Sequence, residues 1–222
     1  MLHISLVSFY RLLLAAITCF PLSALAAGQA QWTEIGPFQA PFSNLRGGSD
    51  GKNLYVVQYG YNLYGSHDGG ASWANLLKGA APSRRIQDIQ VDPIDSRKVW
   101  MLDVDGTLSV SKDAGQTWQN VLKLALIEGK SNASRLRFDS ANPRRLYAFY
   151  LPTVYKSEDG GDSWGQFNAN EEVFADTDNW TEIVSTPGNG DLRAITNRGE
   201  DTIVIVSKDH GRTWQIEGRS SI

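Results

Sequence analysis

The chain has 222 residues, of which 41% are apolar and 10% aromatic, and its formal net charge is −3. This balance argues against a general nucleic-acid-binding protein, whose electrostatic footprint is strongly basic. The single cysteine, Cys19, lies near the N-terminus. A domain that follows it must therefore be held together by packing and not by disulfides.

The N-terminal segment has the layout of a secretory signal. Residues 12–20 are almost wholly apolar, Pro21 ends the run, and small residues at 23–27 offer a cleavage site. The run is too short for a comfortable transmembrane helix, which needs roughly 20 residues. Arg11 is its one firm positive charge, so an uncleaved anchor is the alternative interpretation.

We therefore predict a signal peptide at 1–26, cleaved after Ala26 or Ala27, and an exported domain at 27–222, periplasmic or secreted. Cleavage removes Arg11 and no acid, which leaves 20 basic and 24 acidic residues and a net charge of −4. The remaining chain is long enough to bury a sizeable core.

Four copies of the pattern S-x-D-x-G-x-[ST]-W, here called boxes, recur along this domain, with starts 45, 46 and 50 residues apart. A period of this length predicts one repeated supersecondary unit of the size of a four-stranded propeller blade. The box residues are Ser66, Asp68, Gly70 and Trp73; Ser111, Asp113, Gly115 and Trp118; Ser157, Asp159, Gly161 and Trp164; and Ser207, Asp209, Gly211 and Trp214.

Short runs rich in β-branched, aromatic and aliphatic residues precede each box, with turn residues between them. Strand after strand at this spacing predicts an all-β meander of about four four-stranded units, roughly 40–80, 81–125, 126–172 and 173–222. The expected strands in order are 44–46, 54–57, 62–64, 85–91, 99–102, 107–110, 134–138, 146–149, 153–155, 181–184, 192–195 and 203–206.

Each box is expected in the turn between the third and fourth strands of its unit. There the aspartate can accept backbone N–H groups, the glycine can adopt angles that other residues resist, and the tryptophan can pack between units. A metal-binding role for these aspartates is not expected, because no second ligand recurs beside them.

The boxes resemble the Asp-box, or BNR repeat, of sialidases, sortilin-type receptors, xyloglucan-degrading glycosidases and photosystem II assembly factors. The stretches at 91–93 and 142–143 are similar to the link between the first two strands in the sortilin-like and glycosidase members. The resemblance covers roughly 31–216. It implies a β-propeller in which the boxes serve structure and lie away from the binding site.

The number of units raises a question of closure, because Asp-box propellers in those families usually have six or more blades. Residues 31–35 resemble the fourth strand of a unit that lacks its first three strands, as expected where the N-terminus completes the last blade. However, residues 213–216 already give the last unit a fourth strand of its own. A small closed ring, an open arc completed by another copy and a truncated relative of a longer protein all remain possible.

Arginines recur on the expected innermost strands, which line the channel of a propeller. An arginine can bind a carboxylate or phosphate through two parallel hydrogen bonds. By resemblance, sialidases use three arginines for a carboxylate, and the photosystem II assembly factors carry an arginine patch for a protein partner. Alternatively, the arginines pair with Asp88, Asp103 or Glu182 and only keep the channel soluble. The ligand-binding candidates are Arg46, Arg85, Arg135 and Arg137, with Arg84 close by.

Catalytic candidates are weak. A glycosidase needs two positioned carboxylates, and neither a nucleophile pair nor the Arg-Ile-Pro motif of sialidases is recognisable. Asp103 and Asp105 would share a strand face. Each carboxylate named here as a candidate can be interpreted more simply, as a solvated residue of a loop or as a charge that lines the channel. The other acids lie in the connection before the fourth unit: Glu171, Glu172, Asp176 and Asp178.

Aromatic residues near the middle strands could form a ligand platform, although many must pack between units. They are Tyr59, Tyr61, Tyr64, Tyr147, Phe149, Tyr150 and Tyr155. Asn132 and Asn179 match glycosylation acceptors.

The sequence thus favours an exported, non-catalytic binding or scaffold protein that recognises a protein or a cell-surface carbohydrate through the channel face. The alternative is a glycoside hydrolase of xyloglucanase or sialidase type, or a degenerate relative. We predict no cofactor, no metal and no nucleic-acid partner, and we keep a homo-oligomer open because an open arc exposes strand edges.

Overall fold

The structure is a computed structural model that describes residues 42–78, 85–126, 134–150, 152–170, 173 and 179–221. The chain divides into two compact parts, 1–34 and 35–222, and every described residue lies in the second. The expected signal peptide and the strand expected at 31–35 lie outside the described residues. Within the described ranges no helix is long and apolar enough to cross a membrane.

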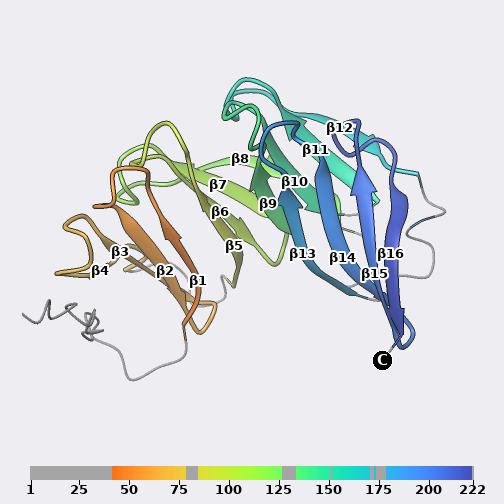
Figure 1. The fold of residues 1–222 in the computed structure, drawn as a ribbon. Coiled ribbons are helices and arrows are strands. Elements are labelled where there is room, and N and C mark those ends of the chain that lie inside the picture. Colours follow the sequence, from red (N-terminus) through yellow and green to blue (C-terminus); the bar gives the residue numbers. More distant parts are fainter. Residues whose placement is uncertain are drawn as a thin grey trace, which may run out of the picture. The chain divides into compact units, whose positions relative to one another are not determined.

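Figure 1 shows four sheets, each built from four consecutive antiparallel strands. Sheet 1 contains β1 (Phe42–Gly47), β2 (Leu54–Gln58), β3 (Asn62–Ser66) and β4 (Ala74–Asn75). Sheet 2 contains β5 (Ile86–Val91), β6 (Val99–Asp103), β7 (Thr107–Ser111) and β8 (Gln119–Lys123). Sheet 3 contains β9 (Arg135–Phe138), β10 (Leu146–Tyr150), β11 (Thr153–Ser157) and β12 (Gly165–Asn168). Sheet 4 contains β13 (Asn179–Ser185), β14 (Leu192–Arg198), β15 (Asp201–Ser207) and β16 (Gln215–Ser221).

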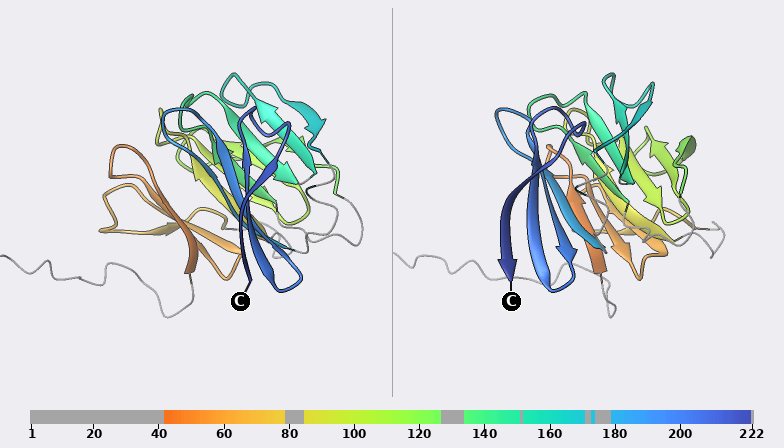
Figure 2. Two further views of the ribbon diagram at one scale, coloured as in Figure 1. Left: turned by 45° about the vertical axis from the view of Figure 1, so that its right-hand side comes forward. Right: turned by 90° about the vertical axis from the view of Figure 1, so that its right-hand side faces the viewer.

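The all-β prediction of four four-stranded units is confirmed, and Figure 2 shows the same sheets from two further directions. The first strands of successive sheets contact one another, β1 with β5, β5 with β9, and β9 with β13. No comparable contact joins β13 to β1 among the described strands. The row of sheets is therefore open.

The second strand of each sheet explains why the sheets stack. Strands β6 and β10 are buried at every position, whereas the outer strands β8 and β12 are largely exposed. Successive side chains of a strand point to opposite faces, so a strand that is apolar throughout needs a neighbour on both sides.

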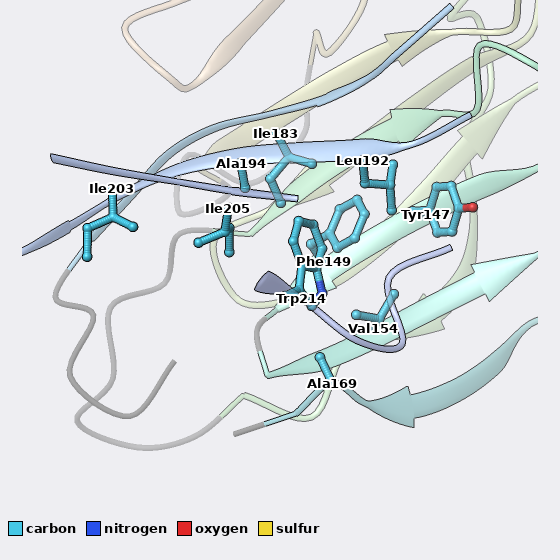
Figure 3. Close-up of a cluster of buried hydrophobic side chains, with 10 residues drawn as sticks. All are labelled: Tyr147, Phe149, Val154, Ala169, Ile183, Leu192, Ala194, Ile203, Ile205 and Trp214. Carbon is cyan, nitrogen blue, oxygen red and sulfur yellow. The ribbon is translucent and has the colours of Figure 1, made fainter. Parts of the chain in front are cut away.

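Three contacts between sheets follow from this alternation. Tyr55 and Val57 of β2 pack with residues of sheet 2, and Trp100 and Leu102 of β6 pack with residues of sheet 3. Figure 3 shows the third contact, where Phe149 of β10 lies beside Trp214, with ring centroids 6.5 Å apart. All these side chains are 0–1% exposed.

Each box forms the turn that follows the third strand of its sheet. In the first box the Ser66 hydroxyl donates to Asp68 Oδ1 at 2.7 Å and accepts the Gly70 N–H at 2.8 Å. Asp68 also accepts the Ser72 N–H at 2.9 Å and its hydroxyl at 2.6 Å, and Trp73 Nε1 donates to the Gly70 carbonyl at 3.0 Å. The same five bonds recur in the other three boxes.

The box glycine lets the turns of sheets 2 and 3 lie directly against the preceding sheet. Gly161 has φ = 92°, and a Cβ atom there would lie 2.0 Å from the Trp100 ring of sheet 2. Trp100 in turn contacts Trp164 edge to face, with centroids 6.1 Å apart. The glycine thus meets a backbone requirement and a packing requirement at once.

We predict that Gly161→Ala destabilises the fold far more than Gly188→Ala. Gly188 has φ = 95° but no atom within 4 Å of an added Cβ, so its substitution reports backbone strain alone, about 1 kcal/mol. The clash with Trp100 should add at least about 2 kcal/mol. Urea unfolding of both variants measures the difference. Equal losses would show that Trp100 does not restrict the box turn.

The boxes should also make stability depend on acid pH. The donors Ser72 and Thr117 hold the pKa of Asp68 and Asp113 at about 2, below the ordinary 3.8. A carboxyl with a depressed folded-state pKa stabilises the fold above its unfolded value, and this is lost as pH falls through the folded value. We expect the urea midpoint to fall between pH 3.8 and about 2, and less steeply in Asp113→Asn, whose amide does not titrate. An unchanged slope in that variant would contradict this role.

Candidate functional site

The first strands of the four sheets bring one charged residue each into a row of alternating sign. Arg46 on β1 lies 3.5 Å from Asp88 on β5, measured from Nη2 to Oδ1. Asp88 Oδ2 lies 2.7 Å from Nη1 of Arg137 on β9, and Arg137 also pairs with Glu182 on β13. The row thus links all four sheets on the inner side.

Asp88 is the anchor of this row. Its side chain is 2% exposed, and it accepts the N–H groups of Ile89 at 2.9 Å and of Leu136 at 3.0 Å besides its two arginines. A buried carboxylate needs such compensation, because burial without partners costs several kcal/mol, on the order of 3 to 5. Asp88 therefore ties sheet 2 to sheet 3 through both backbone and side chain.

Arg137, a candidate ligand-binding residue, is engaged within the protein. Its side chain is 10% exposed, and its guanidinium also donates to the carbonyl oxygens of Leu136 and Ile183. Burial lowers the pKa of Arg137, and the Asp88 carboxylate opposes that shift. This arrangement corresponds to the alternative in which an inner arginine pairs with a neighbouring acid.

The other candidate arginines differ in their surroundings. Arg46 is partly exposed and donates to the Leu45 carbonyl at 3.1 Å in addition to its weak contact with Asp88. Arg135, the first residue of β9, is partly buried and donates to the Ser134 carbonyl at 3.0 Å. Arg84 lies outside the described residues.

Arg85 is the candidate that remains accessible. It immediately precedes β5, it is exposed, and no carboxylate of the described ranges lies within ion-pair distance of its guanidinium. The peptide unit that joins it to Ile86 is fixed, because the Arg85 carbonyl accepts the Val104 N–H at 2.8 Å and the Ile86 N–H donates to the Gly60 carbonyl at 2.6 Å. A fixed backbone with a free side chain is suited to binding.

Arg85 borders a hollow of about 310 Å³ between the start of β1, the β2–β3 turn and the start of β5. Tyr59, in that turn, is 58% exposed at φ = 53°, and the neighbouring Tyr61 is 49% exposed. Asn44 joins the two sheets at the floor by donating to the Gln87 carbonyl at 3.3 Å. We call this the Arg85 hollow, with lining residues Phe42, Ser43, Asn44, Tyr59, Gly60, Arg85, Ile86 and Gln87.

The hollow combines a guanidinium, the accessible phenol ring of Tyr59 and side-chain amides. A guanidinium can hold a carboxylate through two parallel bonds, and tyrosine rings offer apolar area with a polar tip. Sequence reasoning singled out Arg85, Tyr59 and Tyr61 but missed Asn44 and Gln87. The signal that could have found Gln87 is its place two residues after Arg85 in the sequence.

The remaining aromatic candidates serve packing. Tyr147, Phe149, Tyr150 and Tyr155 are 0–3% exposed and lie in the contacts between sheets. Tyr64 is partly buried on β3.

The two described carboxylate candidates do not share a face. Asp103 ends β6 and is 1% exposed, whereas the Asp105 side chain lies in the following turn, 62% exposed and 3.0 Å from Lys123 Nζ. The expectation of a shared strand face is therefore wrong, because the strand stops before Asp105. Asn179 is the first residue of β13. Glu171, Glu172, Asp176, Asp178 and Asn132 lie outside the described residues.

Comparison with known proteins places the fold. No family model and no curated protein matches the chain. Among solved structures, YCF48 from Cyanidioschyzon merolae matches with a TM-score of 0.62 and 16% identity, over 86% of this chain and 61% of that one. YCF48 bound to D1 peptide matches with 0.57 and 14% identity, over 82% and 54%. An ancestral GH74 enzyme matches with 0.61 and 19% identity, over 83% and 26%.

These structures are β-propeller proteins, and the four sheets of this chain match their blades. The chain spans 61% of the YCF48 length and 26% of the GH74 chain. At such low identity the likeness concerns the fold alone. The described part of the chain is thus an incomplete β-propeller of four blades.

We predict that Asp88→Asn strongly destabilises the protein, because the buried Arg137 then loses Asp88, the buried one of its two anionic partners. Breaking a buried ion pair from one side costs about 3 to 5 kcal/mol. Asp105→Asn is the matched control, since its ion pair with Lys123 is exposed and is worth at most about 1 kcal/mol. Urea unfolding of both variants tests this. A loss for Asp88→Asn no larger than for the control would show that the row of charges is not structural.

Proposed function

We propose that the protein is an exported, non-catalytic binding protein of the Asp-box type that holds an acidic segment of a partner protein in the Arg85 hollow. The observation that carries the proposal is an exposed arginine without an ion pair to a described carboxylate, set in one hollow with the exposed Tyr59. Export rests on the signal-like residues 1–26, and the Asp-box assignment rests on the four boxes and their shared hydrogen bonds.

The charges of the neighbouring arginines support Arg85 as the binding residue. Arg137 has two carboxylate partners and Arg46 has one, so a ligand would have to displace an internal partner to reach either. Arg85 faces no such competition from the described carboxylates. A ligand carboxylate can pair with it at no cost to the fold.

The structural neighbours are compatible with this proposal. One of them, YCF48 bound to D1 peptide, is a protein-binding propeller. The likeness to an ancestral GH74 enzyme is compatible with glycoside hydrolysis as a second candidate. Release of reducing sugar from xyloglucan by the purified protein, lost in Asp176→Asn or Asp178→Asn, would favour the enzyme.

We predict that Arg85→Ala and Tyr59→Ala weaken capture of the partner from a native envelope fraction by about tenfold or more, which corresponds to about 1.4 kcal/mol. Arg97→Ala is the matched control, because Arg97 is also exposed but lies beyond the opposite end of β5. Quantitative pull-down with the immobilised chain 27–222 measures the loss. Undiminished capture by both hollow variants, with Arg97→Ala also unaffected, would refute the site.

A further inference from the structure

The three contacts between successive blades use the same positions of the repeat. On the second strand, the residue paired with the box serine packs against the preceding sheet, and the residues one and three places after it point forward, towards the next sheet. These two forward positions are filled by fully buried residues in sheets 1 to 3, at 0–1% exposure: Tyr55 and Val57, Trp100 and Leu102, and Tyr147 and Phe149. On the first strand of the next sheet, one residue packs in the same cluster as this pair. It is Ile89 in sheet 2, Leu136 in sheet 3 and Ile183 in sheet 4, each 0% exposed.

The forward face of sheet 4 keeps part of this pattern and is partly exposed to solvent. The pairing of Leu192 with the box residue Ser207 matches that of Leu146 with Ser157, so Ile195 occupies the position of Phe149. Ile195 is 40% exposed, and Val184, on the same face of the neighbouring strand, is 49% exposed.

The backward face of sheet 1 is uncovered in the complementary way. Arg46 pairs with Tyr55 as Arg137 pairs with Tyr147, so Leu45, which lies in the bulge between Ser43 and Arg46, is the counterpart of Leu136 in chain order, on the exposed side of β1. Leu136 is 0% exposed in the contact between sheets 2 and 3, whereas Leu45 is 62% exposed. At one end of the row, sheet 4 therefore exposes the second-strand side of the contact between blades. At the other end, sheet 1 exposes the first-strand side.

Within one chain these halves do not meet among the described strands, since β13 and β1 lack the contact that joins the other first strands. Exposed apolar faces at the ends of an open row mark an association surface. A second copy of the chain is the occupant that fits, because Ile195 and Leu45 would meet at positions of the contact that the chain already makes three times.

We propose that the Ile195 face of one copy binds the Leu45 face of a second copy, head to tail, and that two such contacts related by a two-fold axis close a pair of chains. A head-to-tail contact either closes into a ring or extends into an open filament. The pair joins two four-blade rows and leaves neither end face exposed. This proposal is independent of the Arg85 hollow, because neither Ile195 nor Leu45 lines that hollow.

The test is the mass of the chain 27–222 in solution, measured by light scattering and sedimentation. We expect a dimer for the unaltered chain and a monomer for Leu45→Arg and for Ile195→Arg, each with unchanged circular dichroism. Ile94→Arg is the matched control and should stay dimeric, since Ile94 is 65% exposed in a turn outside both faces. Leu45→Gln and Ile195→Gln, which disturb folding less, should each raise the dissociation constant of the dimer.

Mixing the two arginine variants gives the sharpest result. In a mixed pair one contact carries both changes, while the other joins an unaltered Ile195 to an unaltered Leu45. Head-to-tail association therefore predicts partial recovery of dimer on mixing and none for either variant alone. A dimer that survives Leu45→Arg would indicate an Ile195-to-Ile195 contact and overturn the proposal, as would a monomeric unaltered chain. Masses that grow without limit would overturn the closed pair.

Discussion

The structure depends on one constraint, which is that the two inner sheets, 2 and 3, cannot be left uncovered on either face. Strands β6 and β10 are apolar at successive positions, so both faces of their sheets must be removed from water. Stacking satisfies the constraint for the inner sheets, and the box turn helps by letting each sheet approach closely. Gly161 admits the Trp100 ring of the preceding sheet where any Cβ would collide. The hydrogen bonds of the box hold the turn shape that makes this approach possible.

Stacking brings polar groups as well as apolar ones into the interior, and the row of charges resolves that conflict. Asp88 and Arg137 are almost fully buried, and each has partners for its charge from more than one sheet. Compensation becomes weaker towards sheet 1, where Arg46 is partly exposed and lies 3.5 Å from its acid. At Arg85 no described acid compensates the charge. The candidate site lies at the place where internal pairing gives way to solvent.

The fold could be predicted because its signals are local. The boxes span eight residues, and the strands alternate with a period of two, so both can be read from short windows of sequence. Which arginines are exposed and which are buried could not be predicted in this way. Irregular pairing shifts the register between Ser43 and Arg46, and between Ile86 and Asp88. A one-residue shift changes the face to which a side chain points. Arg85 and Arg137 therefore look equivalent in the sequence, although one is exposed and the other is buried.

A propeller fold carries many functions, so the features that distinguish this chain must lie outside the boxes. One of them is the forward face of sheet 4. Where the other sheets place Tyr55, Trp100 or Tyr147, this sheet places Arg193, which is bonded to Glu217 at 2.7 and 2.9 Å. Burying such a pair permanently would forfeit its hydration with little net gain. Leaving it in water beside Ile195 and Val184 gives a face that tolerates solvent and still offers apolar area to a partner. This composition is that of an interface that forms between folded molecules, in contrast to the dry contacts inside the chain.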